Sequence, residues 1–380
     1  MWLRFHGCWG WWCGTLLACA EARWVQVSDF NTWQPEASGS ATWISPEWRR
    51  PKPFQELVVS WNLHAAAELR IEAQVQTAGR WGRWWDLGHW SEIASSAPAS
   101  GTTAATVSTS NPPRRTSVRG QRDDSGSVDT DTLMVPKGGQ AVRLRVRFSD
   151  PTHTPAVLKR MDLAFWSPDS APAKSPEAPA QTAPAAARPS SERAHPPAIL
   201  EVPLKSQADY PEGVTQWCSP TSLAMLMAFW GRQTARPEWD LDVRTVAAGV
   251  HDPGWPGTGN WAFNVAYAGS RPGLQAAAVR LGGIADLQAL LDSGIPVATS
   301  VSYAVLKGGA KPEKGDGHLI VVCGFSGSTV TVNDPGVRLS RVRRQFPLSA
   351  FQAAWSASHQ TAYVVWPEAR SLPISPLGTW

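Results

Sequence analysis

Apolar and polar residues alternate with a period of two along much of the first half of the chain. The clearest runs place an apolar residue at every second position of 57–63, 69–75 and 142–148. This alternation is typical of half-buried β-strands. Turn-rich stretches such as 94–111 separate the runs, so residues 23–166 are expected to form an all-β sandwich of roughly seven to nine strands.

The pattern changes to helices followed by strands after residue 199. A continuous apolar run follows Cys218, with Pro220 suited to the first turn of a helix and Gly231 to its end. Later segments are predicted as helices at 262–269 and 284–293, a strand at 295–301, and a hairpin with arms at 318–323 and 329–333. This order predicts a C-terminal α+β domain over residues 199–368 and a tail at 369–380.

Cys218 stands where the predicted helix begins. The unpaired N–H groups and the dipole at a helix N-terminus stabilise a thiolate, which lowers the pKa of a cysteine there. His318 opens the first arm of the predicted hairpin, and Asp334 follows the second arm. If the turn is centred near Ser326, His318 and Asp334 face each other with Cβ atoms roughly 5 Å apart. These residues therefore predict a Cys-His-Asp constellation of nucleophile, base and orienting group.

At these residues the chain resembles the papain-like cysteine peptidases related to the bacteriocin-processing, double-glycine leader peptidases. The matching segments are V-P-L-K-S-Q at 202–207, W-C-S-P-T-S-L-A-M-L at 217–226, G-H-L-I-V-V-C-G-F at 317–325 and V-T-V-N-D-P at 330–335. The resemblance covers about residues 199–368 and implies a papain-like fold. It assigns the catalytic roles to Cys218 as nucleophile, His318 as base, Asp334 as orienting group and Gln207 as oxyanion-hole residue.

Two positions depart from the family's pattern. Gln207 lies farther before Cys218 than is usual in the family, so Gln216 is a competing candidate for the oxyanion role. Ser219 stands where many relatives have glycine. We expect the glycine-rich loop at 255–261 to lie beside the substrate channel. The expected substrate-binding residues are Trp217, Gly259, Asn260 and Trp261.

A disulfide between Cys218 and Cys323 is the alternative interpretation, because two cysteines in an oxidising compartment often form one. Cys323 lies at an odd offset from His318, which sends the two side chains to opposite faces of a strand. If His318 faces Cys218, Cys323 does not. We therefore expect Cys323 to be a small buried core residue.

The beginning of the chain has the features of an export signal. Arg4 and His6 precede an apolar segment at 9–18 that is too short to span a bilayer, and small residues follow. Residues 1–22 are therefore expected to be a signal peptide and the mature protein to be secreted or held in the cell envelope. The stretch 16–19 also resembles a lipoprotein cleavage site, which would anchor the protein through a lipid on Cys19; simple secretion is favoured.

Composition narrows the remaining possibilities. The net charge of +4, without a run of five or more Lys or Arg, gives no indication of nucleic-acid binding. Many of the 22 tryptophans lie in the first half and are interpreted as core residues, with a sugar or peptide platform as the alternative. The acidic segment 122–131 does not match an EF-hand and is expected to form a hairpin turn rather than a calcium loop. No metal or organic cofactor, no transmembrane segment in the mature chain and a monomeric state are expected.

Residues 167–198 hold eight prolines among many alanines. Such a segment is expected to be an extended linker that lets the two domains move independently. The first domain carries no catalytic constellation and could be a targeting or substrate-positioning module.

The favoured hypothesis is a multi-domain secreted cysteine peptidase or amide hydrolase acting on a peptide or protein, for example a cell-envelope peptide. Cys218 would attack an amide carbonyl, and water would hydrolyse the resulting thioester. Transamidation by the same triad remains open. A different class is the alternative: a non-catalytic envelope binding protein whose papain-like domain recognises peptide or glycan.

Overall fold

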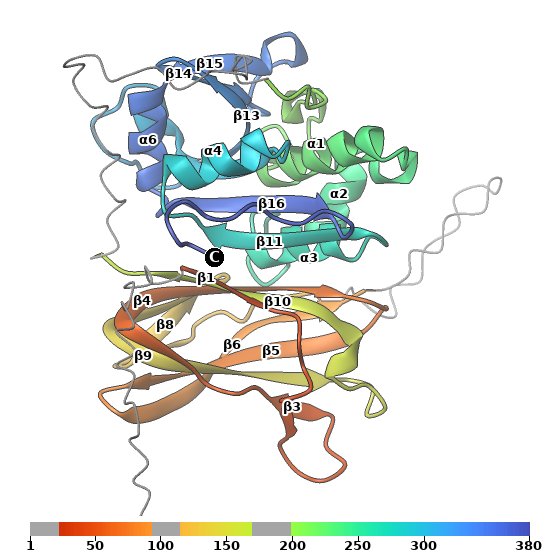
Figure 1. The fold of residues 1–380 in the computed structure, drawn as a ribbon, viewed down its shortest axis with the longest axis vertical. Coiled ribbons are helices and arrows are strands. Elements are labelled where there is room, and N and C mark those ends of the chain that lie inside the picture. Colours follow the sequence, from red (N-terminus) through yellow and green to blue (C-terminus); the bar gives the residue numbers. More distant parts are fainter. Residues whose placement is uncertain (1–22, 93–114, 169–198) are drawn as a thin grey trace, which may run out of the picture.

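The computed structural model describes residues 23–92, 115–168 and 199–380, which form a β-rich N-terminal domain and an α+β C-terminal domain (Figure 1). The expected signal peptide with Cys19, the whole turn-rich stretch 94–111 and most of the linker lie outside the described residues. None of the described helices is long and apolar enough to cross a membrane.

The described part of the N-terminal domain contains ten strands joined in one hydrogen-bonded network. The strands are β1 (Trp24–Val27), β2 (Gln34–Pro35), β3 (Thr42–Ile44), β4 (Trp48–Leu63), β5 (Glu68–Thr77), β6 (Arg80–Ser91), β7 (Arg122–Asp123), β8 (Gly126–Asp129), β9 (Thr132–Phe148) and β10 (Leu158–Trp166). The all-β class is as predicted, and the number of strands is higher. The acidic segment forms the β7–β8 hairpin.

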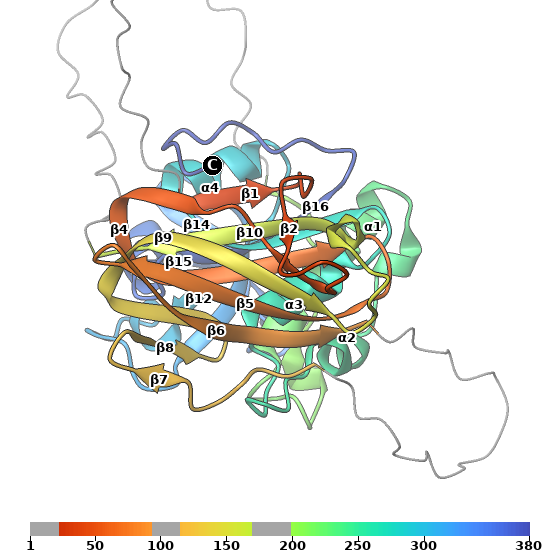
Figure 2. The same cartoon turned by 90° about the horizontal axis from the view of Figure 1, so that it is seen from below.

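Two long strands, β4 and β9, organise this domain (Figure 2). They pair with each other, while β4 also pairs with β10 and β9 also pairs with β3, β5 and β8. Residues 56–63 of β4 are buried on both faces, although the sequence alternates apolar and polar residues there. Asn62, one of the polar residues of this stretch, contacts the backbone of the second domain.

The C-terminal domain is built on a six-stranded antiparallel sheet in the order β11-β16-β12-β13-β14-β15. Its strands are β11 (Leu274–Arg280), β12 (Val297–Ser302), β13 (Gly317–Ser326), β14 (Thr329–Asn333), β15 (Arg343–Pro347) and β16 (Thr361–Pro367). Its helices are α1 (Cys218–Gln233), α2 (Val243–Val250), α3 (Trp261–Gly269), α4 (Ile284–Asp292), α5 (Tyr303–Leu306) and α6 (Leu348–Ser356). Short 3₁₀ turns complete the domain.

Helix α1 begins at Cys218, as predicted, and ends two residues after Gly231. It is apolar on all sides because it lies between the sheet and the helices α2 and α3. Three side chains fix it to the sheet: Ser222 Oγ donates to the Leu319 carbonyl at 3.1 Å, Trp230 Nε1 donates to the Val365 carbonyl at 2.6 Å, and Ser219 Oγ lies 2.9 Å from the Tyr363 hydroxyl. The sheet therefore determines where the first turn of α1 lies.

The two domains share a buried interface. Phe263 of α3 packs against Trp61 and Trp90 of the N-terminal domain, with ring centroids 6.2 and 5.4 Å away. The Asn62 carboxamide pairs with the backbone of Ala276 through two hydrogen bonds of 2.9 Å. Such contacts argue against the expectation that the linker lets the domains move independently, because separating the domains would expose them to water.

Several ion pairs also cross the interface, and two of them share Glu56. Arg280 of β11 is 2 % exposed, and its Nη2 donates to Glu56 at 2.5 Å. His359 Nδ1 lies 3.0 Å from the same carboxylate, and its ring stacks on Trp166 at 3.7 Å between centroids. Leaving a buried charge without its partner is costly, so these pairs tie the domains in one arrangement.

The C-terminal tail is part of this arrangement rather than a free extension. The Trp24 N–H of β1 donates to the Thr379 carbonyl at 2.9 Å, and the rings of Trp24 and Trp380 lie 5.4 Å apart. Ser375 Oγ donates to Asp286 of α4 at 2.7 Å. The tail therefore bridges the first strand of one domain and a helix of the other.

Candidate active site

Cys218, the first residue of α1, meets His318, the second residue of β13. The His318 imidazole lies close enough to the Cys218 thiol for each group to shift the pKa of the other. His318 Nε2 lies 2.8 Å from Asp334 Oδ1, so the other ring nitrogen, Nδ1, is the one that faces the cysteine. The structure thus brings the three residues of the predicted constellation together in the order sulfur, imidazole, carboxylate.

Asp334 follows β14 and is completely buried. Its Oδ1 accepts from His318 and from the Gly336 N–H at 2.9 Å, while its Oδ2 accepts from Arg344 Nη1 at 2.7 Å and the Tyr303 hydroxyl at 3.0 Å. Every donor around this carboxylate favours its charged form. An asparagine at position 334 would turn its NH2 group toward two of these donors, and donors cannot hydrogen-bond to one another.

The pairing of the hairpin differs from the predicted register. The turn lies at Gly327 and Ser328 rather than around Ser326, and a register shift at Cys323 adds one residue to β13. Regular pairing ends at Val321 and Asn333, so His318 and Asp334 are not directly opposed. Asp334 reaches the imidazole because the chain turns beyond β14, where the Asp334 N–H donates to the Val342 carbonyl.

The surroundings shift the pKa values of all three groups. Burial alone would raise the pKa of the Cys218 thiol, but the hydrogen bond and charge of His318, with backbone N–H groups, lower it below the usual range. Burial would lower the pKa of His318, whereas Asp334 and Cys218 raise it to about 9. The pKa of Asp334 falls to about 2, because His318, Gly336 and Arg344 outweigh burial. The imidazolium form of His318 is thus favoured at neutral pH, and the Cys218 thiol loses its proton more readily than an ordinary cysteine.

Cys323 does not pair with Cys218. Both cysteines are free, and the Cys323 side chain is fully buried. Burial raises the pKa of the Cys323 thiol to about 12, so this residue stays neutral in the core. The two cysteines therefore differ in chemistry, as predicted.

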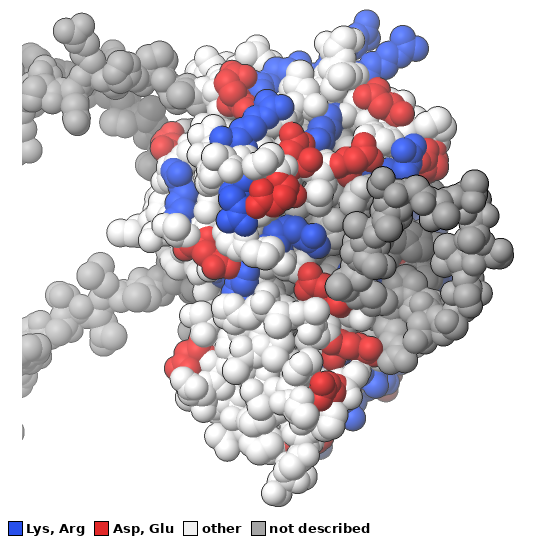
Figure 3. All heavy atoms as spheres, turned by 90° about the vertical axis from the view of Figure 1, so that its right-hand side faces the viewer, with Lys and Arg blue, Asp and Glu red and all other residues white. Residues whose placement is uncertain are grey.

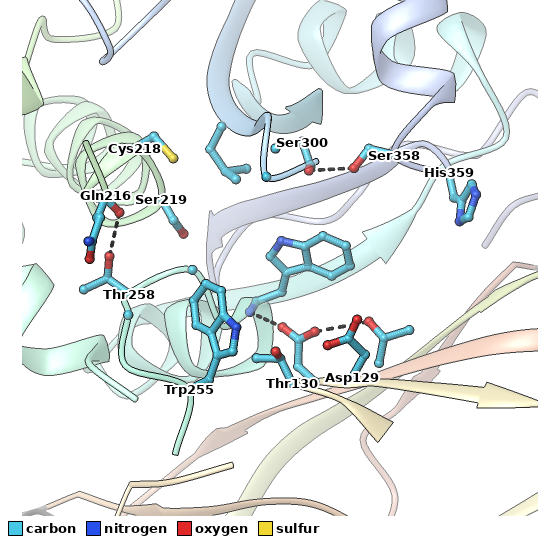
Figure 4. Close-up of a pocket in the computed structure, with 18 of the residues that line it drawn as sticks. Asp129, Thr130, Gln216, Cys218, Ser219, Trp255, Thr258, Ser300, Ser358 and His359 are labelled. Atoms are coloured by element: carbon cyan, nitrogen blue, oxygen red, sulfur yellow. Dashed lines mark hydrogen bonds between the residues drawn. The ribbon is translucent and has the colours of Figure 1, made fainter. Parts of the chain in front are cut away.

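Cys218 lies at one side of a cavity of about 910 Å³ that lies between the two domains (Figure 4). The C-terminal domain contributes the start of α1, the loop from Trp255 to Gly259, Ser300 of β12 and His359. The N-terminal domain contributes Glu56 and the turn between β8 and β9. The cavity thus joins a candidate nucleophile to surfaces of both domains.

The expected substrate-binding residues lie in different places. Gly259 and Trp261 line the cavity. Trp217 is not among its lining residues and packs its ring against Tyr210, 5.7 Å away. Asn260 is buried and caps helix α3, its Oδ1 accepting from the Phe263 N–H at 3.1 Å. Asn260 therefore supports the loop rather than facing a ligand.

The two candidate oxyanion residues are also separated. Gln216 lines the cavity, and Gln207 does not. Gln207 is buried, with Nε2 donating to the Val214 carbonyl at 2.7 Å and Oε1 lacking a hydrogen-bond partner within the described residues. Its backbone N–H donates to the Pro335 carbonyl at 3.0 Å, which places it next to the Asp334 turn.

The sequence did not indicate Tyr303 and Arg344, which donate hydrogen bonds to Oδ2 of Asp334. Tyr303 begins α5 directly after β12, and Arg344 lies in β15. Arg344 pairs with Val332, two residues before Asp334. Neither residue belongs to a recognisable motif, so only the pairing of β14 with β15 could have indicated this contact.

The described residues contain no group of three or more His, Cys, Asp or Glu side chains that could hold a metal ion. On the face shown in Figure 3, Lys and Arg are interspersed with Asp and Glu among the described residues rather than gathered in a single-sign patch. The geometry is that of a cysteine and a histidine close together beside an interdomain cavity.

Comparison with known proteins divides the chain in the same way as the structure. Residues 199–363 match the Peptidase_C39 like family, and residues 14–162 match the Peptidase C39 N-terminal domain. The C-terminal domain therefore belongs to the C39-like family of papain-like peptidases.

A solved structure from Bacillus anthracis, described as a C39-like peptidase, is 17 % identical to the chain. The match covers 45 % of this chain and 98 % of that chain, with a TM-score of 0.34. No curated protein matches the sequence.

Proposed function

We propose that the protein is a cysteine peptidase with Cys218 as nucleophile, His318 as acid and base, and Asp334 as orienting group. The observation that supports this most is the His318–Asp334 hydrogen bond beside Cys218, which lies at the side of a cavity. The lowered pKa of Cys218 adds to it, because the thiolate is the reactive form.

In the proposed reaction the Cys218 thiolate attacks the carbonyl carbon of a peptide bond. The His318 imidazolium gives its proton to the leaving nitrogen, the C–N bond breaks, and a thioester remains. Water then attacks the thioester while His318 accepts one of its protons, which releases the carboxylic acid and restores the thiolate. The Asp334 carboxylate stabilises the imidazolium in the resting state and keeps the ring in position.

We propose Gln207 and the Cys218 backbone N–H as donors to the oxyanion. One N–H of the Gln207 carboxamide is bound to Val214, and the second has no partner among the described residues. Gln216 is the competing donor because it lines the cavity. Removing one oxyanion donor lowers kcat by about 10²–10³, so comparing Gln207→Ala with Gln216→Ala assigns the role.

The central test is cleavage of a diverse peptide library by the full chain, read by mass spectrometry. Wild type should cleave, Cys218→Ala should not, and Cys323→Ala should retain cleavage as the matched cysteine control. Peptide binding without cleavage by folded wild type would contradict the peptidase proposal and favour a binding protein.

We further propose that residues 1–22 are an export signal and that the mature chain works outside the cytoplasm. The division into a sandwich-like domain at 23–166, a linker at 167–198 and a peptidase domain at 199–368 belongs to the same proposal. It is supported by the two matched regions, 14–162 and 199–363. N-terminal sequencing of protein recovered from the host envelope or medium tests the signal, and a start well before residue 20 would contradict it.

A further inference from the structure

The cavity beside Cys218 has a wall that the N-terminal domain supplies. This wall comes from the turn between β8 and β9, together with the neighbouring residues of these strands. It contributes Asp129, Thr130, Asp131, Thr132 and Met134 to the lining. Figure 4 shows Asp129 and Thr130 across the cavity from Cys218. A substrate lying against the nucleophile would therefore also meet this turn.

The β8–β9 turn is held in a defined position. Asp129 pairs with Thr132 across it, and Thr130 at its tip has a φ of +57°, a conformation that non-glycine residues adopt rarely. Asp131 accepts a hydrogen bond from the Trp261 N–H at the start of α3. The turn is thus bound to the loop of the other domain that lines the same cavity.

The turn presents two carboxylates that form no ion pair among the described residues, although Arg280 lies near enough to Asp131 to act on its charge. Asp129 is exposed and makes no ion pair there. Asp131 is only 6 % exposed and is held by the Trp261 N–H and the Thr132 hydroxyl, with no ion pair. Burial raises the pKa of Asp131 to about 7 despite these hydrogen bonds. A cation bound beside Asp131 would offset the cost of burying the negative charge of the Asp131 carboxylate.

The other charges of the cavity are already engaged. Glu56 and Arg280 neutralise each other, and His359 is bound to the same Glu56 carboxylate. Arg119 lines the cavity as well, and its guanidinium donates to the Gly254 carbonyl. The Asp129 carboxylate is therefore the negative group that remains available to a ligand.

Trp255 provides an independent indication of a ligand. It lines the cavity and is 44 % exposed, unlike the tryptophans of the core. Its ring lies against Gly257 and Gly259, where an added Cβ would come within 2.6 and 3.3 Å of ring carbons. The loop thus keeps the indole in the cavity, where an exposed aromatic face can cover the aliphatic stem and cation of a lysine or arginine.

We propose that the N-terminal domain completes the substrate site and that its β8–β9 turn selects a basic side chain of the peptide. Asp129 binds the cationic group, Asp131 adds to the negative potential, and the Trp255 indole covers the stem. The inference rests on the proposed peptidase function, because it places this subsite in the same cavity as Cys218.

Charge reversal in the turn tests the selectivity of cleavage. Wild type should cleave library peptides with Lys or Arg enriched at one position relative to the scissile bond. Asp129→Lys should lower kcat/KM for those peptides by about tenfold or more and remove the enrichment. Asp124→Lys makes the same charge change at an exposed site of the same hairpin outside the cavity and should leave the profile unchanged. Wild-type cleavage without basic enrichment would overturn the proposal.

Binding without turnover separates this inference from the peptidase proposal. Full-length Cys218→Ala, immobilised, is equilibrated with peptides that differ only in a central lysine, norleucine or glutamate. The lysine peptides should be retained most, and both Asp129→Lys and Trp255→Ala in this background should remove the preference. Equal retention of lysine and norleucine peptides would refute the subsite. Preferential retention combined with an inactive wild type would instead refute the peptidase function alone.

Discussion

Truncation of Phe263 to alanine should weaken the coupling between the two domains. Phe263 is fully buried, lies between Trp61 and Trp90, and fits so closely that a Cβ added at Gly88 would come within 3.1 Å of its ring. Removing a buried phenylalanine costs about 3–5 kcal/mol, a large part of the 5–15 kcal/mol that stabilises a typical domain. Because the lost contacts lie between domains, the loss should fall on the interface.

Urea unfolding followed by far-UV circular dichroism and by tryptophan fluorescence measures this effect. Wild type should unfold in a single transition in which both signals coincide, whereas Phe263→Ala should show two separated transitions. Phe351→Ala is the matched control, because Phe351 is equally buried but packs on Trp355 within the C-terminal domain. It should lower stability by a similar amount and keep the single transition.

Two results would refute this reasoning. Two separate transitions in wild type would mean that the interface does not couple the domains, and coincident transitions in Phe263→Ala would mean that Phe263 does not carry the coupling. A chain that starts at Pro197 extends the test. It would expose Phe263 and the backbone that Asn62 covers, so it should aggregate or unfold more readily than the full chain.

Three further predictions concern the site and its pKa values. At pH 6 a low concentration of iodoacetamide should alkylate Cys218 and leave Cys323 unmodified in the folded protein. Mass spectrometry of tryptic peptides would show the difference, and equal labelling of the two cysteines would contradict the lowered pKa of Cys218. Asp334→Ala should lower the pKa of His318 from about 9 toward its usual range and reduce kcat by at least tenfold, measured by NMR titration and by peptide cleavage; an unchanged rate would place the orienting group elsewhere. In the folded protein the pKa of Asp131 is raised to about 7, above its unfolded value near 4. The contribution of Asp131 to the free energy of unfolding is therefore fully present below about pH 4 and is lost as the pH rises through about 7. Asp131→Asn should therefore gain stability relative to wild type between pH 4 and pH 8, by up to roughly a few kcal/mol in urea unfolding, and a pH-independent difference would contradict the raised pKa.

The sequence was most informative where chemistry and local structure coincide. The apolar run with Pro220 and Gly231 located helix α1 and placed Cys218 at its first residue. His318 and Asp334 were paired correctly as neighbours, but for a partly wrong reason. The shift at Cys323 and the position of the turn change the pairing, and neither follows from an alternating pattern of apolar residues.

Contacts between distant parts of the chain could not be predicted in this way. Asn62 and Glu56 occupy the polar positions of an alternating strand, which a sequence pattern assigns to solvent. They are buried because a second domain covers that face. The Asp129–Asp131 turn likewise becomes part of the cavity through its contact with Trp261, a residue more than a hundred positions away. Asn260 shows the opposite error, since a residue in a promising loop serves as a helix cap.

The contact between Trp24 and Thr379 protects the edge of a sheet. β1 pairs with β10 on one side, and an unpaired strand edge can pair with the edge of another chain and start aggregation. The N–H of Trp24 is instead taken by the tail, and the ring of Trp380 lies beside the Trp24 ring. During synthesis this cover forms only after Thr379 and Trp380 have left the ribosome. Until then, and after any proteolytic loss of these residues, the first strand remains open to association with other molecules.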